Sequence, residues 1–275
     1  MIHRRPDRVL VVIPVYGHHR MTHELLADLA QEADVADVVV VDNRGDYPVR
    51  DNEDVLRPGQ NLGWAGGTNR GTAELRRSEH LGFLWLNNDT RLAPGFVTGL
   101  LKAWRSTGAG IIGPFYDCHW IHQRDPCLPQ VDHYTPQPKH YRSKFIDGTA
   151  MFVPASTITR IGLLDEVTFA PLGWGAEIDY CLAATSAGLD VAVTRLSYLH
   201  HERSVTAQTV FAGGYEEYLG RAYPVALEGL TRKWGSDWQK RAGIDPETSQ
   251  TTLRDRGDQL GLRGHLSRMA TRIGR

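Results

Sequence analysis

The sequence is short of cysteine, of long apolar segments and of net charge, and each shortage excludes a class of protein. Its 275 residues include 3 cysteines, an odd number that argues against the paired disulfide framework of a small secreted domain. No run approaches the roughly 18 uninterrupted apolar residues that a membrane-spanning helix needs. A formal net charge of −1 gives no overall attraction to nucleic acid or to an anionic membrane. These absences leave a globular protein long enough to bury a substantial core.

The N-terminal residues also lack the pattern of a secretory signal. Basic residues in "MIHRRPDRVL" are followed by a hydrophobic run that Pro14 and Gly17 interrupt, so no apolar signal core is present. We therefore expect a cytoplasmic protein that binds no nucleic acid.

The glycine-rich segment 60–71 lacks both common phosphate-binding signatures. "QNLGWAGGTNRG" shows neither the G-x-G-x-x-G spacing nor the lysine of a P-loop. This counts against a dinucleotide-dependent dehydrogenase and against an NTPase. The glycines would still let the backbone approach a ligand closely, and a following helix would offer N–H groups to an anion. A glycine-rich turn without a ligand explains the segment equally well.

Residues 114–143 lack both periodicity and the usual spacing of zinc ligands. Prolines, histidines and aromatic residues follow one another there without a helical or strand period, and a loop of this length is usually functional or mobile. No C-x-x-C or H-x-x-x-H pair is present, so we do not expect a structural zinc site. The residues considered for such a site are Cys118, His119, His122, Cys127, His133 and His140.

What the sequence does contain is a regular alternation of strand and helix patterns. Valine-rich runs at 8–14 and 37–42 are typical of strands buried on both faces, and residues 21–33 between them have helical apolar spacing. This alternation predicts an α/β fold whose mostly parallel sheet is flanked by helices. Further strands are predicted at 54–58, 82–86, 108–114 and 144–154, with a strand pair at 189–201; further helices are predicted at 68–79, 93–106, 155–164 and 175–188.

The chain is predicted to divide into a core domain, residues 1–204, and a helical C-terminal extension, residues 205–275. Segment 114–143 would be an insert in the core domain. Residues 213–243 have amphipathic helical spacing despite a proline. The arginine-rich stretch 253–275 is predicted to be a frayed helix or a partner-binding tail.

Polar side chains follow the predicted strands where those strands end. "FLWLNNDTRL" delivers Asn87, Asn88 and Asp89 directly after a buried run, and Asp42 ends an earlier one. Ligands bind beyond the carboxyl ends of strands in such sheets, and hard cations prefer oxygen ligands. These positions are candidates for binding a metal ion, a ribose or a nucleobase. The alternative is a set of polar turns, because Asn and Asp are common turn residues.

Two further groups could take part in catalysis or metal binding. Glu177 and Asp179 occupy the first turn of a predicted helix, where the helix dipole favours negative charge. They face different directions, so they form no obvious acid–base pair, and stabilisation of the helix start explains them as well. His200 and His201 end a predicted strand, where a neutral imidazole could bind a metal or serve a structural role.

The order of these motifs is more specific than any one of them. "VVIPVYG", "VVVVDN", "NLGWAGGTNRG", "LWLNNDT", "DGTAMFVPASTITRIGLLDE" and "AEIDYCLAATSAG" follow in turn, then a strand ending in "HH". This series resembles glycosyltransferase family 2, and most closely its rhamnosyltransferase-like bacterial members with the GT-A fold. The resemblance covers residues 8 to about 205 and implies that residues 1–204 bind a nucleotide sugar and carry out catalysis.

The resemblance also implies roles for particular residues. Asp89 would bind the metal together with His200, Glu177 would be the catalytic base, and Asn88 would contact the ribose. We expect the helix N-terminus to keep Glu177 ionised near neutral pH. The remaining donor-binding candidates are Pro14, Val15, Tyr16, Asp42, Asn61, Gly66 and Asn69, and those on the acceptor side are Asp147, Gly148, Trp174 and Asp179.

The activity implied is inverting transfer of a sugar from a dTDP-, UDP- or GDP-linked donor, with Mn²⁺ or Mg²⁺. The acceptor could be a saccharide, a lipid-linked saccharide met at the inner membrane face, a peptide or a natural product, and a homo-oligomer is left open. Two departures from the family stand out: Asn88 replaces an acid of the D-x-D-like motif, and Ala176–Glu177 replaces the "ED" acids.

Two alternatives remain at this stage. A non-catalytic nucleotide-sugar-binding relative is conceivable because of the acids that the two motifs lack. A sugar nucleotidyltransferase should carry a glycine-rich, arginine-containing loop after the first strand, where this chain reads "PVYGHHRM". That second alternative is therefore disfavoured.

Overall fold

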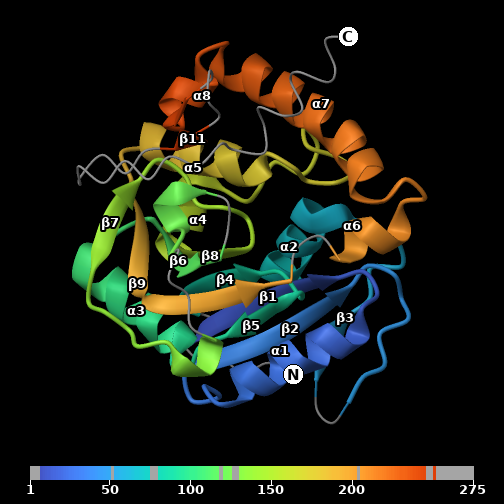
Figure 1. Cartoon of the computed structure of the whole chain (residues 1–275), viewed down its shortest axis with the longest axis vertical. Helices are drawn as coiled ribbons and strands as arrows, with labels where there is room; N and C mark the ends of the chain where they lie inside the picture. Colours follow the sequence, from blue (N-terminus) through green and yellow to red (C-terminus); the bar gives the residue numbers. More distant parts are fainter. Residues whose placement is uncertain are drawn as a thin grey trace.

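A nine-stranded sheet flanked by helices runs through the molecule (Figure 1). The structure, a computed structural model, describes residues 7–50, 53–74, 80–117, 120–125, 130–202, 205–245 and 250–251. The strand order is β3-β2-β1-β4-β8-β6-β9-β5, with β7 paired to β9. The predicted α/β class is confirmed, but the described sheet is mixed rather than mostly parallel, since β8 runs antiparallel to β4 and β6, and β5 and β7 run antiparallel to β9.

Four parallel strands form one half of the sheet. Strands β2 and β4 flank β1 and run parallel to it, and β3 continues beyond β2. Because the strands are parallel, their carboxyl ends meet at one edge of the sheet. The elements are β1 (Val9–Val15), α1 (His19–Ala30), β2 (Ala36–Asp42), β3 (Asp54–Leu56), α2 (Gly63–Glu74) and β4 (Gly82–Leu86).

The other half of the sheet mixes both strand directions. Strand β8 is antiparallel to β4 and β6, whereas β6 and β9 are parallel. The elements are β5 (Thr90–Leu92), α3 (Phe96–Thr107), β6 (Ile111–Tyr116), β7 (His140–Ser143), β8 (Ala150–Pro154), α4 (Ala155–Ile161), α5 (Ala176–Ser186) and β9 (Val191–His201). Two 3₁₀ turns, Ile121–Gln123 and Val131–His133, lie between β6 and β7.

Three local features differ from the prediction. Residues 191–201 form one long strand rather than a strand pair. The short strands β5 and β7 were not predicted, since each pairs with β9 and three or four residues carry too little pattern to reveal them. Helix α2 begins at Gly63, earlier than predicted, and the Asn61 side-chain oxygen accepts the Gly63 N–H at 2.9 Å in the turn that leads into it.

The C-terminal part begins with helices, as its amphipathic pattern predicts. In Figure 1, α7 lies at the top of the molecule, with α5 between it and the strands. The elements are α6 (Val205–Val210), α7 (Gly214–Trp234), α8 (Trp238–Arg241) and a small pair, β10 (Ile244–Asp245) with β11 (Gln250–Thr251). The arginine-rich stretch 253–275, and with it the proposed tail, lies outside the described residues.

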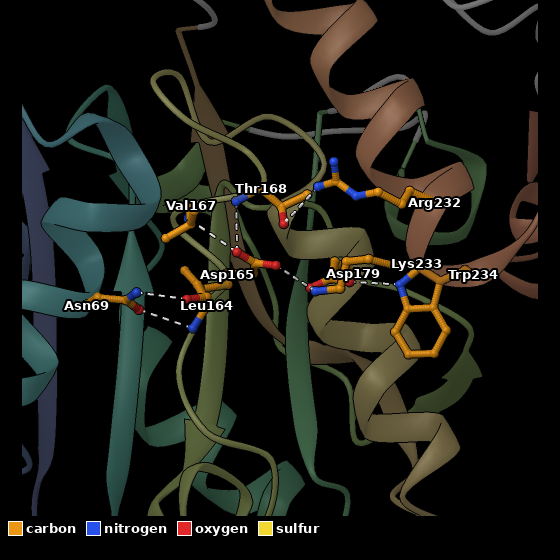
Figure 2. A network of polar contacts seen from close by, with 9 residues as sticks. All are labelled: Asn69, Leu164, Asp165, Val167, Thr168, Asp179, Arg232, Lys233 and Trp234. Atoms are coloured by element: carbon orange, nitrogen blue, oxygen red, sulfur yellow. Dashed lines mark hydrogen bonds and ion pairs between the residues drawn. The ribbon is translucent and has the colours of Figure 1, made fainter.

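A polar cluster fastens the end of α7 to α5 (Figure 2). Buried Asp179 accepts hydrogen bonds from Lys233 Nζ and Trp234 Nε1, each at 2.7 Å. Lys233 also pairs with Asp165 at 2.8 Å. We call these four residues the α7 clasp, because they join a helix start to a helix end that lies far along the chain.

The same view shows a second fastening on α2 (Figure 2). The Asn69 amide donates to Leu164 O at 2.8 Å and accepts the Leu164 N–H at 3.1 Å. A side chain that satisfies both the N–H and the C=O of one residue fixes the turn that contains that residue.

Among the described residues, no helix is both long and apolar enough to cross a membrane.

Candidate active site

A cleft of about 370 Å³ lies at the carboxyl edge of the parallel strands. The ends of β1, β4 and β9 and the first turn of α5 form one side, and residues of α6 and α7 form the other. Its volume falls in the range of small-molecule sites, and its position is the one at which α/β sheets bind ligands.

The cleft brings together many of the side chains singled out from the sequence. They come from the first strand, from the loop before α2, from the turn after β4 and from the start of α5. The predicted residues that line the cleft are Pro14, Val15, Tyr16, Asn61, Asn88, Asp89, Asp147, Gly148, Trp174 and Glu177.

Asp89 meets a histidine at the floor of the cleft. It sits in the turn between β4 and β5, and its Oδ1 lies 3.1 Å from His201 Nε2. Burial disfavours charge on both groups, but their mutual attraction outweighs it. The pKa of Asp89 is therefore lowered and the pKa of His201 is raised. The contact therefore favours the charged form of each side chain.

The histidine beside Asp89 is not the one predicted. His200 points away and pairs through Nδ1 with Asp117 at 2.8 Å, with 43% of its side chain exposed. Successive side chains of a strand face opposite sides of the sheet. His200, the histidine predicted to share a metal with Asp89, therefore does not face it, whereas His201, its neighbour on β9, does.

Glu177 lies in the first turn of α5 and is partly exposed to the cleft. Its Oε2 accepts the Gly175 N–H at 3.1 Å. Burial, followed by the charge of Asp147, raises the pKa of Glu177 to about 8. The expectation that the helix N-terminus keeps this carboxyl ionised is therefore wrong. Loss of water around the group and a neighbouring acid outweigh the helix dipole.

Asp147 is the acid that acts on Glu177, and its own carboxylate is firmly held. It accepts hydrogen bonds from Trp120 Nε1 at 2.9 Å, and from the Thr149 N–H and hydroxyl at 3.0 and 2.6 Å. At the next residue, Gly148, an added Cβ would lie 3.2 Å from the Trp64 ring and 3.5 Å from the Glu177 Cβ. The glycine lets this loop pack closely against the base candidate.

Two predicted donor-binding residues have other contacts in the structure. Asp42 accepts the N–H groups of Gly45 and Tyr47 at 2.8 and 2.9 Å and pairs with Arg57 at 3.3 Å. It therefore closes a turn, as the Asx-turn alternative holds, and does not line the cleft. Asn88 does line the cleft, but its amide nitrogen donates to Thr22 Oγ1 at 3.1 Å, so α1 sets its orientation.

Three other predicted residues lie away from the cleft lining. Asn69 pins α2 to the Leu164 turn, and an added Cβ on Gly66 would lie 3.0 Å from Leu62 Cβ. Asp179, predicted on the acceptor side, belongs to the α7 clasp. Its position two residues after Glu177 places it on another face of α5.

The sequence did not reveal the side of the cleft that the helices supply. Phe211, Tyr215 and Tyr218 line it, and Tyr218 lies near the carboxyl groups of both Glu177 and Asp89. Burial, then Tyr215, Glu177 and Asp89, raise the pKa of Tyr218. Trp64 and Trp120 also line the cleft. The sequence pattern around these aromatic residues indicates that their rings pack in the interior, but it does not reveal that they border a cleft.

The insert offers no alternative centre within the described residues. Cys118, His119 and Cys127 lie outside them. Across the described part of the chain, no group of three or more His, Cys, Asp or Glu residues is arranged to hold a metal ion.

Comparison with known proteins gives close relatives without a known function. The chain is 36% identical over 236 residues to Uncharacterized protein Rv1525 of Mycobacterium tuberculosis and to Uncharacterized protein Mb1552 of Mycobacterium bovis, covering 86% of this chain and 88% of each relative. No protein-family model matches the sequence.

A solved structure gives the fold. The crystal structure of GalNAc-T7 with UDP, GalNAc and Mn²⁺ superposes with a TM-score of 0.53 at 12% identity. The match covers 70% of this chain and 43% of that one, so this chain corresponds to less than half of it. The likeness shows a GT-A, Rossmann-like fold.

Proposed function

We propose that the chain is an inverting glycosyltransferase of the family 2 type, because it has a GT-A fold. The chain belongs to one family with the uncharacterized mycobacterial proteins, so the proposal extends to them. It would move a sugar from a nucleotide-diphosphate sugar to an acceptor hydroxyl. The observation that carries this proposal is that Asp89 and Glu177 line one cleft at the carboxyl edge of the sheet.

The donor set at the floor of the cleft fits a divalent cation shared with a substrate. Asp89 offers a carboxylate and His201 an imidazole nitrogen, with 3.1 Å between the nearest atoms. Mg²⁺ and Mn²⁺ sites of this kind commonly use one or two protein ligands and complete the shell with phosphate oxygens. Asp89 and His201 would hold the ion, which when bound would stabilise negative charge on the leaving diphosphate.

Glu177 is the proposed base. The acceptor oxygen would form a bond to the anomeric carbon as the bond to the diphosphate breaks, and the acceptor proton would pass to Glu177. Attack from the face opposite the diphosphate inverts the anomeric configuration. A pKa of about 8 makes the ionised carboxyl a stronger base than an ordinary glutamate, and a base is most effective when its pKa lies near the working pH.

The nucleotide would lie along the ends of β1 and β2. Pro14, Val15 and Tyr16 line this end of the cleft, and the Arg44 guanidinium lies 5.9 Å from the Tyr16 ring centre. Asp42 would act indirectly, since it fixes the turn that follows cleft-lining Asn43. Gly66 and Asn69 would likewise shape α2 rather than touch the sugar nucleotide.

A thermal-shift screen of UDP-, GDP- and dTDP-sugars with Mn²⁺ tests the proposal. A ligand that binds the folded state raises the melting temperature, so we expect at least one nucleotide sugar to stabilise the wild-type chain. Asp89→Ala should lose the Mn²⁺-dependent part of that shift. As a control, Asp190→Ala removes an exposed acid that pairs with Arg142 on the surface and should leave the shift intact.

Two results would count against the proposal. Absence of any stabilisation by the three donor classes would exclude a nucleotide-sugar site. Tight binding with neither hydrolysis nor transfer would favour a non-catalytic nucleotide-sugar-binding relative.

A further inference from the structure

A second cavity, of about 320 Å³, lies beside the cleft. Its walls come from the strap 169–174, from Phe211 and from the α7 residues Ala222 and Val225. Leu172, Trp174 and Phe211 line both the cleft and this cavity. A single layer of side chains therefore separates the second cavity from the cleft that holds Glu177.

The second cavity is chemically unlike the floor of the cleft. Its lining consists of apolar and aromatic side chains together with Arg221. That guanidinium pairs with Glu217 Oε1 at 2.5 Å and lies 5.5 Å from the Phe211 ring centre. Because the charge of Arg221 is already paired with Glu217, the cavity favours an apolar group over a phosphate or a free sugar.

The strap that divides the two spaces is held closely against α2. An added Cβ on Gly63 would lie 2.0 Å from Pro171 O, and one on Gly173, whose φ is 82°, would lie 2.9 Å from Ala65 N. Only glycine permits both approaches. Trp174 also meets Tyr223 of α7 edge-on, with ring centres 6.2 Å apart. These contacts hold the strap against both α2 and α7.

Building on the function proposed above, we infer that the second cavity binds the apolar part of the acceptor. The acceptor would be amphipathic: its hydroxyl would reach Glu177 in the cleft, and an alkyl or aryl group attached to it would pass Trp174 into the cavity. The two spaces are adjacent and share Leu172, Trp174 and Phe211 as lining residues, and this adjacency is the observation that assigns this occupant.

Binding of simple glycosides tests the inference without requiring the natural acceptor. Methyl, phenyl and n-octyl β-D-glucopyranoside, the last kept below its micelle-forming concentration, are titrated into the full chain while tryptophan fluorescence is followed. We expect the octyl or the phenyl compound to bind at least tenfold more tightly than the methyl compound, and the better of the two distinguishes an alkyl from an aryl group.

Two variants on α7 locate the binding. Val225→Trp fills the cavity and should abolish the preference for the apolar glycoside. Glu228→Trp adds the same side chain at an exposed position of the same helix and should keep it. Should Val225→Trp fail to fold, Ala222→Leu makes a smaller change at a buried wall position and should weaken the preference.

Equal binding of all three glycosides by the wild-type chain would overturn the inference, and so would a preference that is undiminished in Val225→Trp or in Ala222→Leu. This outcome is distinguishable from failure of the proposed function. The glycoside titration reads the cavity alone, whereas the nucleotide-sugar screen reads the donor site alone.

Discussion

The two sides of the cleft differ in chemistry and in how they are held. The polar wall consists of Asn88, Asp89, Asp147, Glu177 and His201, and the helical wall consists of Val210, Phe211, Tyr215, Tyr218 and Leu227. Groups of the polar wall can bind a cation or accept a proton. The helical wall offers aromatic and aliphatic surface, with Val210 and Leu227 45% and 39% exposed. Under the function proposed above, this difference predicts that the polar wall carries out the reaction and that the helical wall selects the ligand.

The polar wall is fixed by contacts close to it. Strand β5 follows Asp89 directly, and Arg91 on that strand makes two hydrogen bonds of 2.8 Å to Asp28 on α1. The helical wall is fixed partly from a distance, by the α7 clasp, and partly by the 2.7 Å contact between His18 and Thr209, the residue before Val210. Substitutions in the polar wall should therefore change kcat, whereas substitutions that loosen the helical wall should change the KM for the acceptor.

The largest expected effect is on the rate of transfer, and it distinguishes the role of the polar wall from that of the helical wall. Glu177→Gln keeps the size of the side chain but removes the base, so transfer should fall by about 10²–10⁴-fold, the usual contribution of a positioned base. Donor binding, measured by calorimetry, should remain. The matched variant on the helical wall, Leu227→Ala, should lower transfer far less. Unaltered turnover in Glu177→Gln would remove Glu177 from this role.

The next effect tests which histidine serves the metal site. His201→Ala removes a proposed ligand and should reduce Mn²⁺-dependent transfer by at least about 10–100-fold, the loss seen when only an outer-shell partner of a metal ligand is removed. His200→Ala removes the neighbouring ring, which faces Asp117, and should stay near the wild-type rate. A titration of activity against Mn²⁺ checks both. The reverse ranking would restore the original prediction.

Much of the fold could be predicted because buried parallel strands carry a strong local pattern. The runs that became β1, β2 and β4 are continuous and apolar, and their carboxyl ends had to meet at one edge. That rule predicted Asp89 at this edge. Glu177 reaches the same edge from α5, a helix that lies much later in the sequence. Only the resemblance in motif order suggested that Glu177 would lie there.

The parts that could not be predicted depend on tertiary contacts. Whether His200 or His201 faces inward depends on the register of β9 against β5, which the paired "HH" does not encode. Asp179 looks like a catalytic neighbour of Glu177 in the sequence, but its partners Lys233 and Trp234 lie far away in the chain. The raised pKa of Glu177 similarly follows from burial and from Asp147.

A smaller effect concerns the pH dependence of the polar wall. As the proposed base, Glu177 must be ionised to act, and its pKa of about 8 means that kcat/KM should rise with pH until about pH 8. Asp147→Asn removes a negative neighbour, which lowers that pKa and moves the acidic limb of the profile to lower pH. Relative to its own maximum, the variant should be a few-fold more active near pH 6.5 than the wild type. An unmoved limb would mean that Asp147 does not act on the base.

The smallest effect on turnover, and the one that tests the helical wall, comes from the α7 clasp. Lys233→Met leaves buried Asp179 without its cation and should reduce the free energy of unfolding by about 1–3 kcal/mol, the usual penalty for a buried group that loses a charged partner. Chemical denaturation measures this loss. Because α7 supplies most of the helical wall, the KM for the acceptor should rise while donor hydrolysis keeps its rate.

The control variant is Lys240→Met, which removes the same charge from an exposed position on α8. It should change neither the free energy of unfolding nor the KM for the acceptor. A fall in kcat with an unchanged acceptor KM would show that the two walls are not independent, since the clasp would then be supporting Glu177 through α5.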